Sequence, residues 1–156
     1  MSNISARLAE LDITLPEPRP PVANYVPFVL AGSLLFVSGQ ICVGLDGKLA
    51  DTHKGKLGAE ISLEDGQLAA RLCAIQILAQ ARAALGDLDR IARCVRLGGF
   101  INALPNYGNL PVVMNGASDL MVALLGDKGR HARTTVGVAE LPFDAAVEVE
   151  AIFEVA

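Results

Sequence analysis

Two charged side chains near the C-terminus have the chemistry to handle a small carboxylate. Arg133 is the only cation in the run of small and apolar residues from Ala132 to Ala139, and its planar guanidinium can bind a carboxylate through two hydrogen bonds. Glu148 follows in the next apolar stretch, where a carboxylate could hold a water molecule and accept its proton. We therefore consider a site in which Glu148 faces Arg133 from a neighbouring strand or from a neighbouring subunit.

Both side chains also allow a simpler interpretation. In the last stretch, Glu148, Glu150 and Glu154 alternate with apolar residues, which is typical of a strand with one buried side and one solvated side. The carboxylates would then lie on a solvent-exposed face of the sheet and have no catalytic role. Arg133 would form a surface salt bridge with Glu148 or Glu140.

Other reactive residue types show no pattern of a site. His53 and His131 lie far apart and have no His or Cys neighbour at ligand spacing, so we expect no metal centre. Ser38 has no evident His and Asp partners for acyl transfer. The pair Gly98-Gly99 does not open a helix after a strand, so we expect a bulge there and no nucleotide-binding loop.

The elements that must position these residues alternate along the chain. Periodicity, caps and turn residues predict the following elements: a helix over Ile4–Leu11, a hairpin of strands over Val22–Val29 and Leu34–Ser38, a helix from Ser62 to Gly86, a strand over Ile91–Ala103, a helix from about Tyr107 or Leu110 to Leu125, and two strands joined by the turn at Pro142. This order predicts an α+β fold in which two helices pack on one face of a mixed sheet.

The longer predicted helices have clear apolar faces. Ser62 followed by Asp65 resembles a capping box, and the apolar face of the first helix is predicted to contain Leu68, Leu72, Ile75, Ala79 and Ala83. The second helix is predicted to bury Val113, Met114, Ala117, Leu120 and Leu124.

Size and composition limit the class of protein. The chain has 156 residues, which predicts a single domain over 1–156 with a helix and Pro-rich arm at 1–21 as an extension. Because 52% of the residues are hydrophobic, we expect a buried subunit interface. The net charge of −4 argues against nucleic-acid binding, which needs clustered cations.

Cellular context follows from cysteine use and apolar runs. The chain has an odd number of cysteines, and they lie far apart in the sequence: Cys42, Cys73 and Cys94. We therefore expect reduced, buried thiols, as in a cytoplasmic protein. The N-terminus has no apolar core of a signal peptide, and no long uncharged apolar window predicts a membrane span.

Several segments together resemble the Rid family of reactive intermediate deaminases, also called the YjgF family. By position, Tyr25 matches the family's Pro-Tyr-Ser-Gln segment, and Ser38-Gly39-Gln40 matches its Ser-Gly-Gln. The runs Arg133–Leu141 and Val147–Glu150 match its C-terminal signature. The order and spacing of these matches extend over most of the chain, from about Tyr25 to Ile152.

The resemblance implies a fold, an assembly and a reaction. It implies a chorismate-mutase-like α+β subunit in a homotrimer, with sites in the clefts between subunits. It also implies hydrolysis of enamines and imines, such as 2-aminoacrylate, to 2-keto acids and ammonia without a cofactor. Arg133 would bind the substrate carboxylate, Glu148 would hold the attacking water, Tyr25 would line the pocket, and Tyr107 and Asn115 would complete it.

The sequence also departs from the family pattern. Thr135 stands where the family often has a Cys, which leaves open whether Thr135 takes over its place in substrate binding. Phe28 stands where the family's Pro-Tyr-Ser-Gln segment has its Gln, which would make that side of the site more apolar. We therefore expect a divergent subgroup whose preferred imine can differ.

Two other functions stay open at this point. A non-catalytic trimer could use Arg133 only to hold a 2-keto acid or another small carboxylate. A ribonuclease or translation inhibitor, an activity attached to relatives, is disfavoured by the acidic charge and the lack of a basic stripe.

Overall fold

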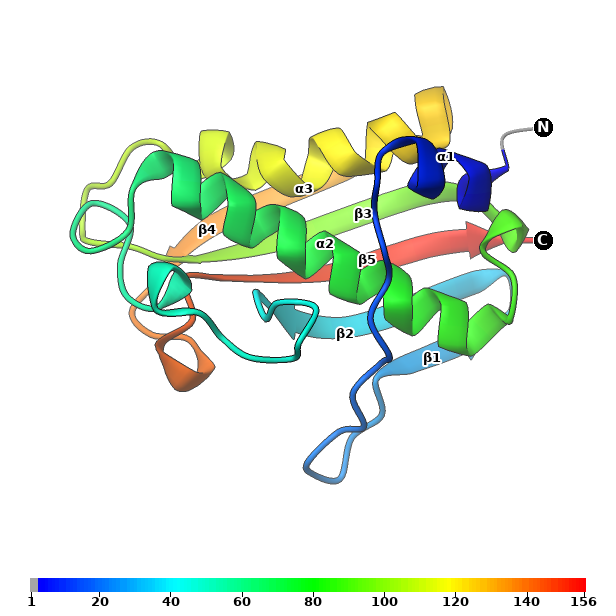
Figure 1. Cartoon of the computed structure of the whole chain (residues 1–156), viewed down its shortest axis with the longest axis horizontal. Helices are drawn as coiled ribbons and strands as arrows, with labels where there is room; N and C mark the ends of the chain where they lie inside the picture. The colour runs from blue at the N-terminus through cyan, green and yellow to red at the C-terminus, as the bar shows by residue number, and fades with distance from the viewer. Residues whose placement is uncertain (1–2) are drawn as a thin grey trace.

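The computed structural model describes residues 3–156 and shows an α+β fold built on one mixed sheet (Figure 1). Its elements in chain order are α1 (Ile4–Glu10), β1 (Phe28–Ala31), β2 (Leu34–Ile41), α2 (Leu63–Leu85), β3 (Ile91–Asn102), α3 (Leu110–Leu125), β4 (Ala132–Val138) and β5 (Val147–Val155). Short 3-10 turns lie at Asp51–His53, Leu88–Arg90, Gly126–Gly129 and Pro142–Asp144. The predicted fold class, with both long helices on one face, is confirmed.

The sheet has the strand order β1-β2-β5-β3-β4. Only β3 and β4 run parallel, and the other neighbours are antiparallel. The last two strands therefore follow each other in the chain but do not pair, because β3 lies between them (Figure 1). As a result β4, which carries Arg133, forms one edge of the sheet, whereas β5 lies at its centre.

Helix α2 begins and ends where its caps predict. Ser62 accepts a hydrogen bond from the Asp65 N–H at the first turn, and Gly86 closes the last turn with a φ of 75°, a conformation that glycine adopts without strain. The predicted apolar face is partly wrong, since Leu68 is 53% exposed and Ala83 is also exposed. The buried face instead centres on small residues such as Cys73, because α2 packs against both the sheet and α3.

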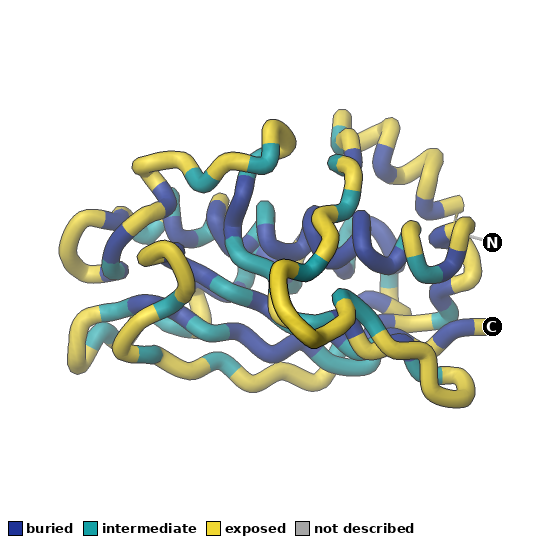
Figure 2. The backbone as a smooth tube through the Cα atoms, turned by 90° about the horizontal axis from the view of Figure 1, so that it is seen from below, coloured by how far each residue is buried: buried dark blue, intermediate teal, exposed yellow. Residues whose placement is uncertain are grey.

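Helix α3 buries the five apolar residues that its periodicity predicts, all fully. Its Gly116 lies directly on the Gln67 carbonyl of α2, where a side chain would overlap the backbone. The two helices therefore approach each other closely and form a continuous layer. That layer covers one side of the sheet, while none of residues 3–156 covers the other side (Figures 1 and 2).

Two strand predictions need correction. The first strand begins at Phe28 and not at Val22, because residues before it form bends. The predicted bulge at Gly98-Gly99 is also wrong, since both residues stay in the β3–β5 ladder and the register shifts lie near Arg93 and Arg96. These glycines provide space: a side chain at Gly98 would overlap Glu150, and one at Gly99 would overlap Met114.

Among residues 3–156, α2 is long and apolar enough to cross a membrane by length and composition alone. The helix contains Arg71 and Arg82, so it is not an uncharged apolar window of the kind considered in the sequence analysis. In the fold, 67% of its most apolar window is buried, and α2 packs on β2 and β5. Its composition is therefore accounted for by its place in the core.

Candidate functional site

Glu148 lies at the second position of the central strand β5. It is in register with Phe100 of β3 and Ile41 of β2, and it is half-buried although its neighbours Val147 and Val149 are fully buried. Burial raises the pKa of the Glu148 carboxyl above its usual value, and the nearby Glu150 carboxylate raises it further. A raised pKa makes this carboxylate a stronger proton acceptor than an ordinary Glu side chain.

The Glu148 carboxyl lines a cavity of about 250 Å³. Tyr25, Gly39, Gln40 and Phe143 also line this cavity. Gly39 has a specific reason to be glycine, because a side chain there would overlap the Glu148 carboxylate. The predicted match of Ser38-Gly39-Gln40 therefore corresponds to a physical need: the carboxylate rests against the bare backbone of β2.

Tyr25 reaches the same cavity through a segment without regular structure. The Ser38 hydroxyl donates to the Val26 carbonyl at 2.7 Å, and the Ser38 N–H donates to the Pro27 carbonyl at 2.9 Å. Tyr25 is thereby held beside the end of β2, and 54% of the residue is exposed. Of the predicted site residues, Tyr25 and Glu148 are thus brought together within one chain.

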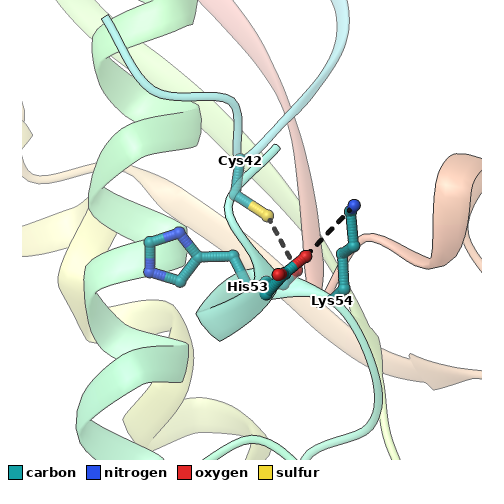
Figure 3. Close-up of polar contacts among 4 residues, drawn as sticks. Cys42, His53 and Lys54 are labelled. Carbon is teal, nitrogen blue, oxygen red and sulfur yellow. Dashed lines mark hydrogen bonds and ion pairs between the residues drawn. The ribbon is translucent and has the colours of Figure 1, made fainter. Parts of the chain in front are cut away.

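The start of β5 is fixed by the loop that contains His53. The His53 carbonyl accepts from the Ala146 N–H at 2.9 Å. It also accepts from the Cys42 thiol at 3.7 Å (Figure 3). The Cys73 thiol of α2 donates to the Val147 carbonyl at 3.4 Å. These bonds attach the backbone just before Glu148 to both the loop and the helix layer.

The three cysteines are free and buried, as predicted. The Cys73 thiol beside Cys42 lowers the pKa of Cys42 to about 7, whereas burial raises the pKa of Cys94 to about 12. Among residues 3–156, no group of three or more His, Cys, Asp or Glu side chains could hold a metal ion.

The turn before β5 carries a feature that the sequence did not reveal. Phe143 and Asp144 have φ values of 58° and 60°, a left-handed conformation that is unfavourable for residues other than glycine. Asn102, which is fully buried, donates to the Asp144 carboxylate at 3.0 Å and to the Gly55 carbonyl at 3.1 Å. These two hydrogen bonds fix the turn, and Phe143, which is 79% exposed, lies at the edge of the Glu148 cavity.

Arg133 lies elsewhere, on the edge strand β4. It is in register with the fully buried Leu97, so its side chain leaves the sheet on the side of the helices. Its Nη1 donates to Asn115 Oδ1 at 2.9 Å and to Ser118 Oγ at 3.1 Å, and its Nη2 donates to the Pro111 carbonyl at 3.4 Å. The guanidinium thus lies on α3, exposed, with three uncharged acceptors.

Arg133 and Glu148 do not meet within one chain. Strand β3 separates their strands, and Glu148 is in register with Phe100, which pairs with Val136 and not with Arg133. The interpretation in which they face each other from neighbouring strands is therefore wrong. The alternative surface salt bridge of Arg133 with Glu148 or Glu140 is also absent among residues 3–156. A different arginine, Arg96, forms an ion pair on β5, with Glu150 at 3.0 Å.

Asn115 contacts Arg133 through the hydrogen bond to its Nη1, whereas Tyr107 lies away from both Arg133 and Glu148. Tyr107 lines a separate cavity of about 480 Å³ together with Lys56 and Leu110. Thr135 lies two residues after Arg133 on the same side of β4, and its hydroxyl is buried without a hydrogen-bond partner among residues 3–156.

Two residues beside Arg133 were not predicted as part of a site. Ser118 is half-buried on α3, and its hydroxyl lies 2.9 Å from Nε2 of His131, a residue that the sequence analysis considered only as a metal ligand. The helical spacing of Asn115 and Ser118, which places both on one face of α3, is the signal that could have found Ser118.

The chain is similar to known proteins over almost its whole length. The family described as "YjgF/chorismate mutase-like, putative endoribonuclease" matches residues 5–154. A Trypanosoma cruzi protein called TCP17 is 47% identical over 152 residues, which cover 97% of this chain and 93% of that protein.

Two solved structures are also similar over nearly their full lengths. A protein of unknown function from Agrobacterium tumefaciens has a TM-score of 0.89 and 47% identity, and the match covers 99% of this chain and 94% of that one. One called a putative endoribonuclease, from Shewanella oneidensis, has a TM-score of 0.93 and 33% identity over 98% and 99% of the two chains. With its sheet, its motifs and these matches, the chain belongs to the YjgF/chorismate mutase-like family, as a divergent member.

Proposed function

We propose that the protein hydrolyses reactive enamines and imines of the 2-aminoacrylate type to 2-keto acids and ammonia, in clefts between the subunits of a homotrimer. The observation that carries this proposal is the division of one chain into two complementary halves. One half is a cavity with a proton-exchanging carboxylate, and the other is an exposed arginine without an acidic partner among residues 3–156.

The two halves need a second copy of the chain to work together. Arg133 lies on an edge strand, where it is accessible to a neighbouring subunit. The uncovered side of the sheet carries apolar side chains on several strands: Val29 is 50% exposed, and Phe36 and Val136 are each 40% exposed. An exposed apolar surface of this kind is typical of an interface between subunits.

The reaction requires few groups. The enamine tautomerises to an imine, water adds to the imine carbon, and the resulting carbinolamine loses ammonia to leave the 2-keto acid. Glu148 accepts the proton of the attacking water and returns it to the departing nitrogen, a contribution of typically about 10²–10⁴-fold. Its raised pKa suits both transfers.

Arg133 positions the substrate. A guanidinium that grips the substrate carboxylate fixes the imine carbon relative to the water, and such positioning can lower the barrier by several kcal/mol. Tyr25 and Phe143 provide apolar surface around the carboxyl of Glu148. No step of this scheme uses a cofactor.

The decisive experiment uses mixed trimers of two inactive variants. Arg133→Ala and Glu148→Gln subunits, carrying different tags, are co-expressed and purified through both tags. In a cyclic trimer containing both variants, one of the three interfaces joins an intact Arg133 to an intact Glu148, so about one third of the wild-type rate returns. If the two residues served within one chain, the mixed trimers would be inactive.

Activity is measured with a pyridoxal-phosphate threonine or serine dehydratase that releases the enamine, by timing 2-keto acid formation above the spontaneous rate. We expect Arg133→Ala to abolish the acceleration while assembly, measured by light scattering, is unchanged. Arg130→Ala is a matched control, because Arg130 is an exposed arginine that pairs with Asp127.

The same preparations test the alternative functions. Binding of 2-oxobutanoate without any acceleration would indicate a regulatory carboxylate binder. RNA cleavage by highly purified protein, lost in the Arg133 or Glu148 variants, would indicate a ribonuclease; the net charge of −4 argues against it.

A further inference from the structure

The groups around Arg133 form a chain of hydrogen bonds whose directions are all determined. His131 Nδ1 lies 2.6 Å from the Gly129 carbonyl, which can only accept, so Nδ1 carries the proton. Nε2 of the neutral ring is then an acceptor, and the Ser118 hydroxyl at 2.9 Å must donate to it. With its hydrogen committed to His131, Ser118 Oγ presents only lone pairs to Arg133 Nη1.

His131 stays neutral in this arrangement. Burial lowers its pKa, the hydrogen bond to Gly129 opposes that effect, and the positive charge of Arg133 lowers the pKa further. The acceptor role of Nε2 is therefore available at neutral pH. Without His131, the Ser118 hydroxyl would be free to turn toward a carbonyl of the preceding helical turn, as serines within helices do.

The chain of bonds also selects one edge of the Arg133 guanidinium. Both hydrogens of Nη1 are used, by Asn115 Oδ1 and Ser118 Oγ, and one hydrogen of Nη2 is used by the Pro111 carbonyl. Within residues 3–156, the Nε–H and the second Nη2–H have no acceptor. Nε and Nη2 lie on the same edge of the planar group. If the Pro111 carbonyl takes the Nη2 hydrogen that points away from Nε, this edge can bind one carboxylate through two hydrogen bonds.

We propose that Ser118 and His131 are positioning residues that hold Arg133 with its Nε–Nη2 edge toward the substrate carboxylate. This inference rests on the proposed function and specifies how its arginine works. Gly129, Ser118 and His131 would act as one unit, in which the ring fixes the hydroxyl and the hydroxyl fixes the guanidinium. Neither side chain needs to touch the substrate.

The test compares binding of 2-oxobutanoate by calorimetry across a set of variants. Ser118→Ala removes a hydrogen bond to a charged group and is expected to weaken binding roughly tenfold. His131→Ala is expected to weaken it severalfold. The double variant should lose no more than Ser118→Ala alone, because both act through one bond. Ser33→Ala, an exposed serine in the β1–β2 turn, is the control and should bind normally.

Two spectroscopic measurements are independent of turnover. In ¹⁵N NMR spectra of the wild-type protein, His131 should be the Nδ1-protonated tautomer. Saturation with 2-oxobutanoate should shift the Arg133 Nε–H signal downfield. An Nε2-protonated ring in the wild-type protein would overturn the proposal even if the variants fold poorly. Additive binding losses in a folded double variant would overturn it as well.

The variants also separate this inference from the proposed function. If Arg133→Ala loses binding and turnover while Ser118→Ala and His131→Ala keep both, the positioning role is wrong and the proposed function stands. If Arg133→Ala binds and turns over normally, Arg133 has no part in the mechanism and the positioning role falls with it. If the wild-type protein does not accelerate 2-keto acid formation, the proposed function itself is wrong.

Discussion

The two halves of the candidate site are held in opposite ways. Glu148 lies on a central strand. The backbone before it donates to the His53 carbonyl, accepts from the Cys73 thiol and follows a turn with two left-handed residues. Arg133 lies on an edge strand, and side-chain and backbone acceptors on α3 orient it at the surface.

The difference follows from what each group needs. The pKa of a carboxyl rises where burial and neighbouring negative charge disfavour its ionised form, so Glu148 needs a partly buried and fixed place. A guanidinium is always charged and needs only the correct orientation of its donors. The contrast predicts that changes at Glu148 alter rate and pH dependence, whereas changes around Arg133 alter binding.

The strongest test of this contrast is Glu148→Gln. Loss of the general base should lower kcat by about 10²–10⁴-fold while substrate KM changes little, as measured in the dehydratase-coupled assay. Glu154→Gln, an exposed carboxylate on the same side of β5, is the matched control. A large rise in KM with an unchanged kcat would contradict the assignment.

Arg133→Lys tests the other half. Lysine keeps the charge but cannot present two parallel donors, so we expect KM to rise about 10–100-fold, the effect of losing one charge-assisted hydrogen bond, with a smaller change in kcat. Arg130→Lys should behave like wild type. If kcat of Arg133→Lys fell by as large a factor as KM rises, the contrast between the two halves would be lost.

Gly39→Ala changes the support of Glu148 without changing its chemistry. The new methyl group would overlap the carboxylate, so we expect the free energy of unfolding to fall by about 1–3 kcal/mol and kcat to fall roughly tenfold, a rate loss that corresponds to about 1.4 kcal/mol. Gly108→Ala is the control, because a side chain there meets nothing within 4 Å. Normal activity in Gly39→Ala would show that the carboxylate can move without consequence.

The smallest expected effect is a shift in pH dependence. Because Glu148 acts as a base, kcat/KM falls as the pH falls through its raised pKa. Glu150→Gln removes a neighbouring negative charge and leaves Arg96 without its partner; both changes lower the pKa of Glu148, so the acid limb should move to lower pH. An acid limb that stays in place would show that another group sets it.

Local signals predicted the parts of the fold that depend on neighbours in sequence. Ser62 and Gly86 marked the ends of α2 correctly, and the periodicity of α3 identified its buried face. The predicted face of α2 was partly wrong, because a helix packed on two sides does not follow a single stripe. Leu68 is exposed for this reason.

The sequence by itself determined the fold class, the ends of the helices and the residue types of the site, since caps, periodicity and motifs are local properties of the chain. Only the tertiary structure decided that β3 separates Arg133 from Glu148, that a strained turn places Phe143 beside the carboxyl, and that Ser118 and His131 join Arg133. Strand order, register and contacts between distant segments arise from packing of the whole chain, and local patterns carry little information about them.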